Sequence, residues 1–336
     1  MIGIGVIGYG YWGPNLVRNL AEQRNAKLIA VSDLRSQRLE LAKSRYPYIY
    51  TTEDHRKLFA DPNIDAIAIS TPVKTHFPLG MQALEAGKHV LLEKPLAAST
   101  AECEQLIEAA AKRNLVLMVD HTFVYTGAVR KIAELVRAGE LGDLYYYDSV
   151  RVNLGLFQPD VNVVWDLAVH DLAIMQYVLP TNPVAVSATG IAHVPGGVEN
   201  IAYLSLFHPD KLISHLHINW LSPVKVRSTL IAGNKKMIVY DDMQMSEKVK
   251  VYDSGITTKE SPEDIYKMLV GYRTGDMWAP KLDGTEALGR EMGHFIDCVE
   301  GKAKPETSAE AGMNVVRILE AAEASIRDRG RPVDLS

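Results

Sequence analysis

The sequence predicts an α/β protein in which a parallel, doubly wound sheet is followed by a second α/β domain with a large, mainly antiparallel open sheet. Two observations predict this order. In the first third, short apolar segments alternate with helical patterns, which is typical of a parallel sheet covered by helices on both faces. From His121 onward, segments rich in aromatic and β-branched residues are separated by Pro, Gly, Asn or Asp, as antiparallel strands are. We therefore expect one domain at residues 1–120 and another at residues 121–336.

The elements of the first domain follow from these patterns. Residues 2–7 are apolar, and Pro14 stands in the first turn of the next helix, where a missing N–H costs nothing. Ser99 and Glu102 form a capping box that starts a later helix. Ligands of such sheets bind outside the carboxyl ends of the strands, and Lys94 lies at one of these ends. The other expected strands are 27–33, 64–70, 89–94 and 114–120, and the other helices are 37–45, 54–59 and 75–86.

The second domain is expected to open with an amphipathic helix, and a second capping box, Thr307 and Glu310, marks its last helix. An open sheet of this size has one face to cover. A homodimer or homotetramer through that sheet is therefore natural, although the chain's own helices would serve equally. The expected strands are 143–152, 185–192, 200–207, 211–220, 225–233 and 235–241, and the helices are 128–139, 163–179, 286–300 and 309–328.

Composition and charge exclude several classes of function. Of the 336 residues, 47% are hydrophobic and 23% charged, and the net charge is -5. Lys and Arg are scattered, so neither nucleic acid nor an anionic membrane surface is implied, and a small molecule is the expected partner. No apolar run is as long as a membrane span, and no export signal precedes the first strand, so a cytoplasmic protein is expected. The cysteines Cys103 and Cys298 lack paired motifs, which argues against a disulfide framework or a metal site.

A glycine-rich turn links the first strand to the first helix. Gly8, Gly10 and Gly13 form this turn, and Asp33 ends the second strand. Together they are the dinucleotide-binding fingerprint of a Rossmann domain, in which the backbone and a helix N-terminus approach a pyrophosphate. Asp33 should bind the adenosine ribose and repel a 2′-phosphate by on the order of 4 kcal/mol at about 4 Å, which favours NAD over NADP. Arg35 either offsets part of this repulsion or is a solvated helix residue.

Asp166 and His170 are four residues apart on an expected helix, so they share one face of it. A buried carboxylate can orient an imidazole and stabilise its charge, and such a pair needs a polar partner. On spacing alone, a structural hydrogen bond between the two side chains is the simpler interpretation. Asp171, the next residue, is expected to be solvated.

The chain resembles the Gfo/Idh/MocA family of nicotinamide-dependent oxidoreductases over essentially its whole length. The resemblance lies in GYGYWG, Asp33, STPVKTH, EKPLA and WDLAVHDL, in this order, and EKP is the most diagnostic element. It implies a Rossmann domain followed by an α/β domain with a large open sheet, and a catalytic set of Lys94, Asp166 and His170. The residues that it implies for NAD binding are Gly8, Tyr9, Gly10, Tyr11, Trp12, Gly13, Asp33, Ser70, Thr71, Pro72, His76, Glu93 and Lys94.

The chemistry implied by this resemblance gives Lys94 a role. When hydride leaves a secondary alcohol, the amine of Lys94 or the imidazole of His170 can take up the hydroxyl proton, and the sequence does not rank them. A neutral amine at pH 7 costs roughly 4 to 5 kcal/mol, which burial and a cationic nicotinamide would reduce. Glu93 either holds Lys94 or the cofactor ribose, or is a surface carboxylate. His121 has ordinary surroundings and is expected to be structural or exposed.

A closer likeness lies in two segments, RVNLGLFQPDVNVVWDLAVHDL and YRTGDMWAPKLDGTEAL. They resemble the subgroup that oxidises nucleotide-linked amino sugars, such as UDP-N-acetylglucosamine and UDP-N-acetylglucosaminuronate 3-dehydrogenases. This implies hydride loss from carbon 3 of a UDP-linked N-acetylhexosamine or its uronate. Many relatives have a glycine-rich run where this chain has DVNVV, so contacts around Asn162 are expected to differ. The implied substrate-binding residues are Lys94, Arg151, Asn153, Gln158, Asn162, Asp166, His170, Trp278 and Lys281.

Three other functions stay open at this point. An inositol, polyol or free-sugar dehydrogenase would use the same residues on another substrate. A glycosidase of the same family would reduce and regenerate NAD in each turnover and release no net NADH. A non-catalytic dinucleotide sensor would keep the glycine turn but would not need Lys94, Asp166 and His170 together, so their joint presence argues against it.

Overall fold

The structure is a computed structural model that describes residues 1–155, 161–194, 197–258 and 270–335. The chain divides into two compact units, residues 1–126 with 285–317, and residues 127–284 with 318–336. Residues 285–317, which the sequence interpretation assigned to the second domain, thus belong to the first unit. The reason is that helix α9 (Ala287–Val299) packs against helix α1 (Gly13–Ala21).

The first unit contains a sheet in which every described strand pair is parallel, in the order β3-β2-β1-β4-β5-β6. The central strands are almost fully buried, as their unbroken apolar runs predict. The strand order reverses between β1 and β4, which is the switch point where doubly wound sheets bind ligands. The strands are β1 (Ile2–Ile7), β2 (Ala26–Ser32), β3 (Tyr50–Thr52), β4 (Ala66–Ile69), β5 (His89–Glu93) and β6 (Leu117–Asp120).

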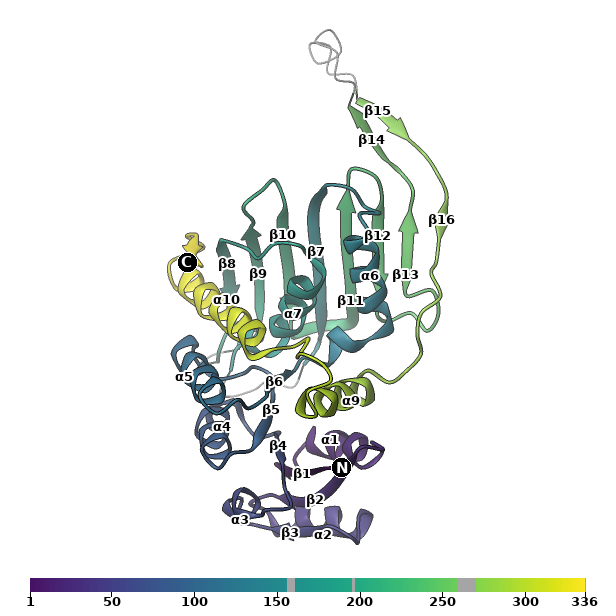
Figure 1. The fold of residues 1–336 in the computed structure, drawn as a ribbon. Helices are drawn as coiled ribbons and strands as arrows, with labels where there is room; N and C mark the ends of the chain where they lie inside the picture. The colour runs from purple at the N-terminus through teal and green to yellow at the C-terminus, as the bar shows by residue number, and fades with distance from the viewer. Residues whose placement is uncertain (156–160, 195–196, 259–269, 336) are drawn as a thin grey trace. The chain divides into compact units, whose positions relative to one another are not determined.

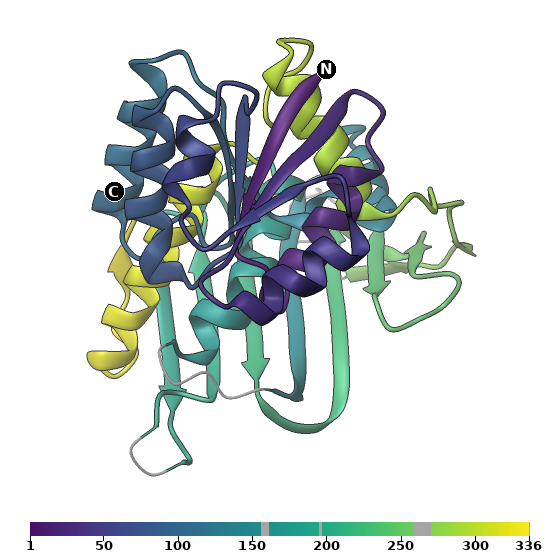
Figure 2. The same cartoon turned by 90° about the horizontal axis from the view of Figure 1, so that it is seen from below.

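Helices flank both faces of this parallel sheet (Figure 2). The capping box at Ser99 is confirmed, because the Ser99 hydroxyl accepts the Glu102 N–H at 3.2 Å. The cap expected at Thr307 is wrong: Ser308 accepts the Ala311 N–H, and Thr307 instead donates to a strand carbonyl. The remaining helical elements are α2 (Ser36–Arg45), α3 (Arg56–Ala60), η1 (Val73–Thr75), α4 (His76–Glu85), α5 (Thr100–Ala111), η2 (Thr122–Tyr125) and α10 (Ala309–Arg327), the last shared between the units.

The second unit contains a sheet with the order β16-β13-β12-β11-β7-β10-β9-β8-β17 among the described residues. The pair β7–β10 is parallel and the other pairs are antiparallel, so the predicted fold class is confirmed. The helices α6 (Gly127–Arg137) and α7 (Val169–Val178) lie against one face of this sheet (Figure 1). The longer strands are β7 (Leu144–Leu154), β8 (Ala185–Ile191), β9 (Ile201–Phe207), β10 (Ile213–Asn219), β11 (Leu221–Gly233) and β12 (Met237–Asp241).

Among the described strands, those that the sequence missed are short. These are β3 and, in the second unit, β13 (Val249–Tyr252), β14 (Gly255–Thr258), β15 (Val270–Arg273), β16 (Met277–Trp278) and β17 (Val333–Asp334). Two to four residues give too little hydrophobic alternation to identify a strand, and pairing with a neighbour decides their conformation.

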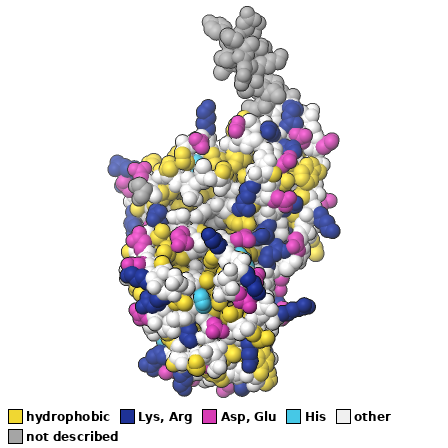
Figure 3. Space-filling view, viewed as in Figure 1, with side chains coloured by type: hydrophobic (Ala, Val, Ile, Leu, Met, Phe, Trp, Pro, Cys, Tyr) yellow, Lys and Arg dark blue, Asp and Glu magenta, His cyan; other side chains and the backbone are white. Residues whose placement is uncertain are grey.

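Lys and Arg side chains are mixed with Asp and Glu on the face that Figure 3 shows. None of the helices in the described part of the chain has the length and apolar character needed to cross a membrane.

Candidate functional site

The carboxyl ends of the parallel strands in the first unit carry the residues predicted to bind the cofactor. Gly8 follows β1, Asp33 follows β2, Ser70 follows β4 and Glu93 ends β5. Because all these strands run in one direction, their carboxyl ends share one edge of the sheet. The structure therefore brings the predicted cofactor residues to a common edge.

The glycine turn shows which of its glycines the protein itself requires. Gly8 has φ +97°, and a Cβ there would lie 2.3 Å from the Ser70 carbonyl oxygen. A Cβ on Gly13 would lie 2.2 Å from the Gly8 oxygen. At Gly10 the nearest atom to such a Cβ is the Arg35 Nη2, at 3.6 Å. Packing thus demands Gly8 and Gly13, whereas Gly10 leaves room above the turn, as a pyrophosphate requires.

Asp33 is nearly buried, and its carboxylate is well occupied. It accepts the Tyr9 N–H at 2.8 Å, the Arg35 N–H at 2.9 Å and the Arg35 Nε at 3.1 Å. Burial acts to raise the pKa of Asp33, but the hydrogen bonds from Arg35 and Tyr9 outweigh it, so the pKa lies below its ordinary value. The Arg35 side chain is 59% exposed and can turn into solvent, which would free Asp33 for a ribose. The site fits NAD once Arg35 has turned away from Asp33.

The other turn residues differ in exposure. Tyr9 is buried, whereas Tyr11 is 89% exposed at the tip of the turn. The Trp12 indole N–H donates to Asp120 at 3.1 Å, which fixes the turn to the end of β6. Ser70 and Thr71 are half-buried and Pro72 is exposed.

His76 links two of the predicted segments. One ring nitrogen lies 2.8 Å from the Thr71 carbonyl oxygen and the other 2.8 Å from the Pro95 carbonyl oxygen. The Lys94–Pro95 peptide bond is cis. Burial lowers the pKa of His76, so the neutral ring donates to only one of the two carbonyls at a time. His76 therefore holds the STP and EKP turns together from inside the protein.

Lys94 is half-buried and directly follows Glu93, the last residue of β5. Its backbone N–H donates to the Glu93 carboxyl at 2.7 Å. Burial, followed by the nearby Asp120, raises the pKa of Glu93 well above its ordinary value. Burial, followed by the charge of Lys94, lowers the pKa of His121 to about 3, so that ring is neutral. Of the two alternatives expected for His121, structural or exposed, the structure excludes exposure, because the ring is buried at 3% exposure.

Asp166 in the second unit lies in a π-helical turn, η3 (Val164–Ala168), directly before α7. Such turns are rare and often occur at functional sites. The Asp166 Oδ2 accepts the indole N–H of the fully buried Trp220 at 3.0 Å. His170, four residues on, is half-buried. Sequence reasoning missed Trp220, whose only signal was a tryptophan directly after the strand that ends in HIN.

Asn162 is used inside the second unit. Its carbonyl oxygen accepts the N–H groups of Val164 and Trp165, at 3.1 and 3.2 Å. Its amide nitrogen donates to Glu199 at 3.1 Å and to Glu323 at 3.2 Å. These four bonds fill the capacity of an amide side chain. The structure thus makes Asn162 the cap of the η3 turn.

Arg151 and Asp171 form a buried ion pair in the second unit. The Arg151 Nε lies 2.5 Å from the Asp171 carboxylate, and both side chains are 4% exposed. The Ser149 hydroxyl also donates to Asp171, at 2.7 Å. The expectation that Asp171 is solvated is wrong, because the arginine on β7 neutralises it and makes its burial possible. Arg151, whose substrate contact stays a prediction, supplies the cation of this pair.

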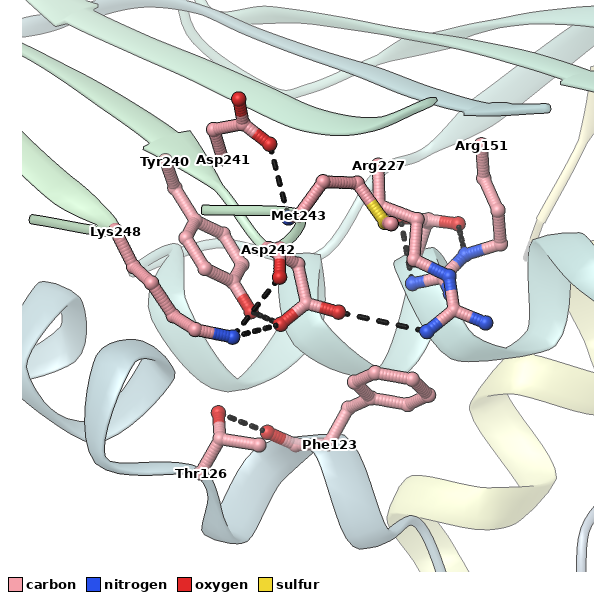
Figure 4. A network of polar contacts seen from close by, with 10 residues as sticks. Phe123, Thr126, Arg151, Arg227, Tyr240, Asp241, Asp242, Met243 and Lys248 are labelled. Carbon is pink, nitrogen blue, oxygen red and sulfur yellow. Dashed lines mark hydrogen bonds and ion pairs between the residues drawn. The ribbon is translucent and has the colours of Figure 1, made fainter. Parts of the chain in front are cut away.

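A second polar network lies on the neighbouring strands of the same unit (Figure 4). Asp242 accepts hydrogen bonds from Tyr240 at 3.2 Å and Lys248 at 3.0 Å, and pairs with Arg227 at 3.4 Å. Burial, followed by the charge of Asp242, raises the pKa of Tyr240 above its ordinary value. Asp242 also acts electrostatically on Arg151, so the two networks are coupled.

The remaining predicted substrate residues are more accessible. Asn153 is half-buried near the end of β7, and Trp278 is 38% exposed on the edge strand β16. Lys281 is exposed beyond that strand. Gln158 lies outside the described residues. Within the described ranges there is no group of His, Cys, Asp or Glu residues able to hold a metal ion, and Cys103 and Cys298 are buried free thiols.

Comparison with known proteins gives matches to two family models. The model for an oxidoreductase family with an NAD-binding Rossmann fold, GFO_IDH_MocA, matches residues 2–121. The GFO/IDH/MocA C-terminal domain model matches residues 129–239. Together they cover well over half of the chain.

Three curated relatives align over part of their length. The uncharacterised oxidoreductase YrbE of Bacillus subtilis is 30% identical, over 56% of this chain and 57% of that protein. The myo-inositol 2-dehydrogenase of Thermotoga maritima is 29% identical, over 56% of this chain and 58% of that protein. The UDP-N-acetylglucosamine 3-dehydrogenase of Acidithiobacillus ferrooxidans is 33% identical, over 56% and 58%. The chain thus matches less than two thirds of each.

Two solved structures share the fold. An oxidoreductase from Agrobacterium radiobacter, in complex with NAD+, L-tartaric acid and magnesium, has a TM-score of 0.82 and 19% identity, over 99% of this chain and 98% of that one. The UDP-N-acetylglucosamine 3-dehydrogenase GnnA from Acidithiobacillus ferrooxidans has a TM-score of 0.80 and 22% identity, over 97% and 98%. At these identities the likeness shows the fold alone.

Proposed function

The chain belongs to the Gfo/Idh/MocA family of NAD-binding oxidoreductases, and from this premise we propose that it oxidises a secondary hydroxyl group of a nucleotide-linked sugar. The observation that carries the proposal is the position of Lys94. It directly follows β5, at the same sheet edge as the glycine turn, beside a neutral His121 and a Glu93 whose pKa burial raises well above its ordinary value.

NAD, when bound, supplies the nicotinamide ring that accepts the hydride. The chain's part is to hold and orient it. The turn at Gly10 and the N-terminus of α1 accept the pyrophosphate, and Asp33 binds the adenosine ribose once Arg35 has turned away. The negative charge of Asp33 favours NAD over NADP, although Arg35 at 3.1 Å weakens that preference.

Lys94 takes up the proton of the substrate hydroxyl as the C–H bond breaks. His170 is the second acid–base group, and Asp166 orients it or stabilises its charge. Trp220 fixes Asp166 by donating its indole N–H to one carboxylate oxygen.

The substrate proposed is a UDP-linked N-acetylhexosamine or its uronate, with hydride leaving carbon 3. The support is the 33% identity to the Acidithiobacillus ferrooxidans enzyme, whose name specifies UDP-N-acetylglucosamine and position 3. A second candidate is an inositol or free sugar, which the Thermotoga maritima myo-inositol 2-dehydrogenase supports at 29% identity. Trp278 and Lys281 are exposed enough to contact a nucleotide or a phosphate.

The second unit also has a face suited to a second copy of the chain. Tyr203, Phe207 and Ile213 on β9 and β10 are 38% to 45% exposed. The Tyr203 ring stacks on His217 with centroids 4.5 Å apart, which makes a flat aromatic surface. A homodimer or homotetramer through this sheet face would remove these side chains from water.

The test is NADH absorbance across a panel of UDP-N-acetylhexosamines, their uronates, the matching free sugars and myo-inositol. Binding energy from a remote nucleotide can position the reacting carbon, so a free sugar should lose turnover as well as affinity. We expect NADH with a UDP-linked substrate and much less with its free sugar. Robust oxidation of myo-inositol or a free sugar, without response to any nucleotide sugar, would transfer the proposal to the second candidate.

A further inference from the structure

Three carboxyl groups meet in the first unit beside Lys94. Glu93 and Asp120 are the last residues of β5 and β6, and they are paired in register. Residues at one register on neighbouring parallel strands point to the same side of the sheet. Glu291 approaches from α9, which packs on η2, the segment just after β6. Asp120 lies within hydrogen-bonding reach of both glutamates.

Glu291 has surroundings that do not suit a charge. It is 0% exposed, and neither carboxyl oxygen has a well-aligned hydrogen-bond donor within the described part of the chain, because the nearby Thr122 hydroxyl donates to Asp120. An unpaired buried carboxylate costs several kcal/mol, so such a group holds a proton instead. Burial, followed by the nearby Asp120, accordingly raises the pKa of Glu291 well above its ordinary value.

Asp120 is the natural acceptor for that proton. The Trp12 indole N–H donates to one of its oxygens at 3.1 Å, and the Thr122 hydroxyl donates to the other. An ionised carboxylate accepts about four hydrogen bonds, so two positions remain. If both carboxyl groups were ionised, neither could donate a hydrogen bond to the other. One proton on Glu291 turns its contact with Asp120 into a charge-assisted hydrogen bond, and a proton on Glu93 does the same.

We propose that Glu291 is a positioning residue that donates its own proton to Asp120, fixing Asp120 against Trp12 and limiting the cluster beside Lys94 to one negative charge. The link to Lys94 rests on the proposed function. Each ionised carboxylate at about 4 Å would stabilise the Lys94 ammonium by on the order of 4 kcal/mol near a surface. Three such charges would stabilise the ammonium more strongly than one, so each carboxylate that carries a proton lowers the cost of a neutral amine. The groups that act on Glu291 are Asp120, Thr122, Tyr125 and Glu93.

The first test is infrared spectroscopy of the protein without cofactor or substrate. At neutral pH the wild type should show the C=O stretch of protonated carboxylic acids, and Glu291→Gln should lose part of that band. The matched control is Glu286→Gln on the residue before α9, whose carboxylate is 51% exposed and paired with Arg18. This control should leave the band unchanged. An unchanged band in Glu291→Gln would overturn the proposal, whatever the substrate is.

The second test is the pH profile of kcat. Glutamine keeps a hydrogen-bond donor for Asp120 and adds no charge. The acidic limb of Glu291→Gln should therefore lie at the wild-type pH, and its kcat should stay within about twofold of the wild type. Glu291→Leu removes the donor, so the limb should move to higher pH and kcat should fall at least about tenfold. If the acidic limb of the kcat profile moved to lower pH in Glu291→Gln, Glu291 would be ionised in the wild type, and the proposal would be overturned. The proposal would also be overturned if folded Glu291→Leu showed the acidic limb at the same pH as the wild type. If no nucleotide sugar were oxidised, the proposed function would be wrong, but the infrared result would still test the protonation of Glu291.

Discussion

In the sequence, two sets of polar residues looked equally suited to ligand binding. One set lies at the carboxyl edge of the parallel sheet, and the other lies in the unit with the antiparallel sheet. Their positions in the structure differ. Gly10, Asp33 and Lys94 gather at one edge of the first unit. In the second unit, Arg151 is buried against Asp171, and Asn162 caps a helical turn. A polar residue at the end of a parallel strand is thus a stronger functional signal than one in an antiparallel sheet.

The physical reason is topological. Parallel strands connected by helices place all their carboxyl ends on one side, so residues distant in sequence converge without further information. In an antiparallel sheet, neighbouring strands end on opposite sides. A polar side chain that faces its core must find an internal partner, and that demand competes with ligand binding.

The largest effect is expected at the buried ion pair between Arg151 and Asp171. Asp171→Ala removes the carboxylate that neutralises the buried Arg151 charge, so the free energy of unfolding should fall by about 3–5 kcal/mol. Urea denaturation followed by circular dichroism measures this. The double variant Arg151→Met, Asp171→Leu removes both charges and should recover most of the loss. A single variant as stable as the wild type would break the comparison and return Arg151 to the candidates for substrate binding.

The next effect is on catalysis in the first unit. Lys94→Ala removes an acid–base group, so turnover should fall by roughly 100-fold or more, while NAD affinity stays largely intact. Steady-state NADH production and fluorescence titration with NAD measure the two quantities. Lys112→Ala is the control and should behave like the wild type, because Lys112 is an exposed lysine at the C-cap of α5 that pairs with Glu108. Unchanged turnover in Lys94→Ala would show that His170 alone handles the proton.

The smallest effect tests how the second unit orients Asp166, a predicted catalytic residue. Trp220→Phe keeps the aromatic volume but removes the hydrogen bond to Asp166. Hydrogen bonds to charged groups contribute about 1.5–3 kcal/mol, so kcat should fall about tenfold or more without loss of NAD affinity. In a double-mutant cycle, Trp220→Phe should add little to Asp166→Asn. Additive losses would indicate that Trp220 acts only through packing.

Most of the fold was accessible from local patterns. The alternation of strands and helices, the capping box at Ser99 and the antiparallel second sheet all depend on residues close in sequence, and the structure confirms them. Short strands such as β3 and β16 were not accessible, because pairing with a neighbour stabilises them. The cap of α10 was misplaced by one residue, since Thr307 donates to the Val119 carbonyl instead.

The sequence by itself determined the glycine turn, the acidic residue after β2 and the position of Lys94, because these depend on spacing along the chain and on the direction of the strands. Only the tertiary structure decided which polar groups are buried and with whom. Asp171 meets Arg151, Asp166 meets Trp220, and Glu291 meets Asp120 across long sequence separations. A buried polar group must find a partner wherever the fold supplies one, and local sequence holds no record of that partner.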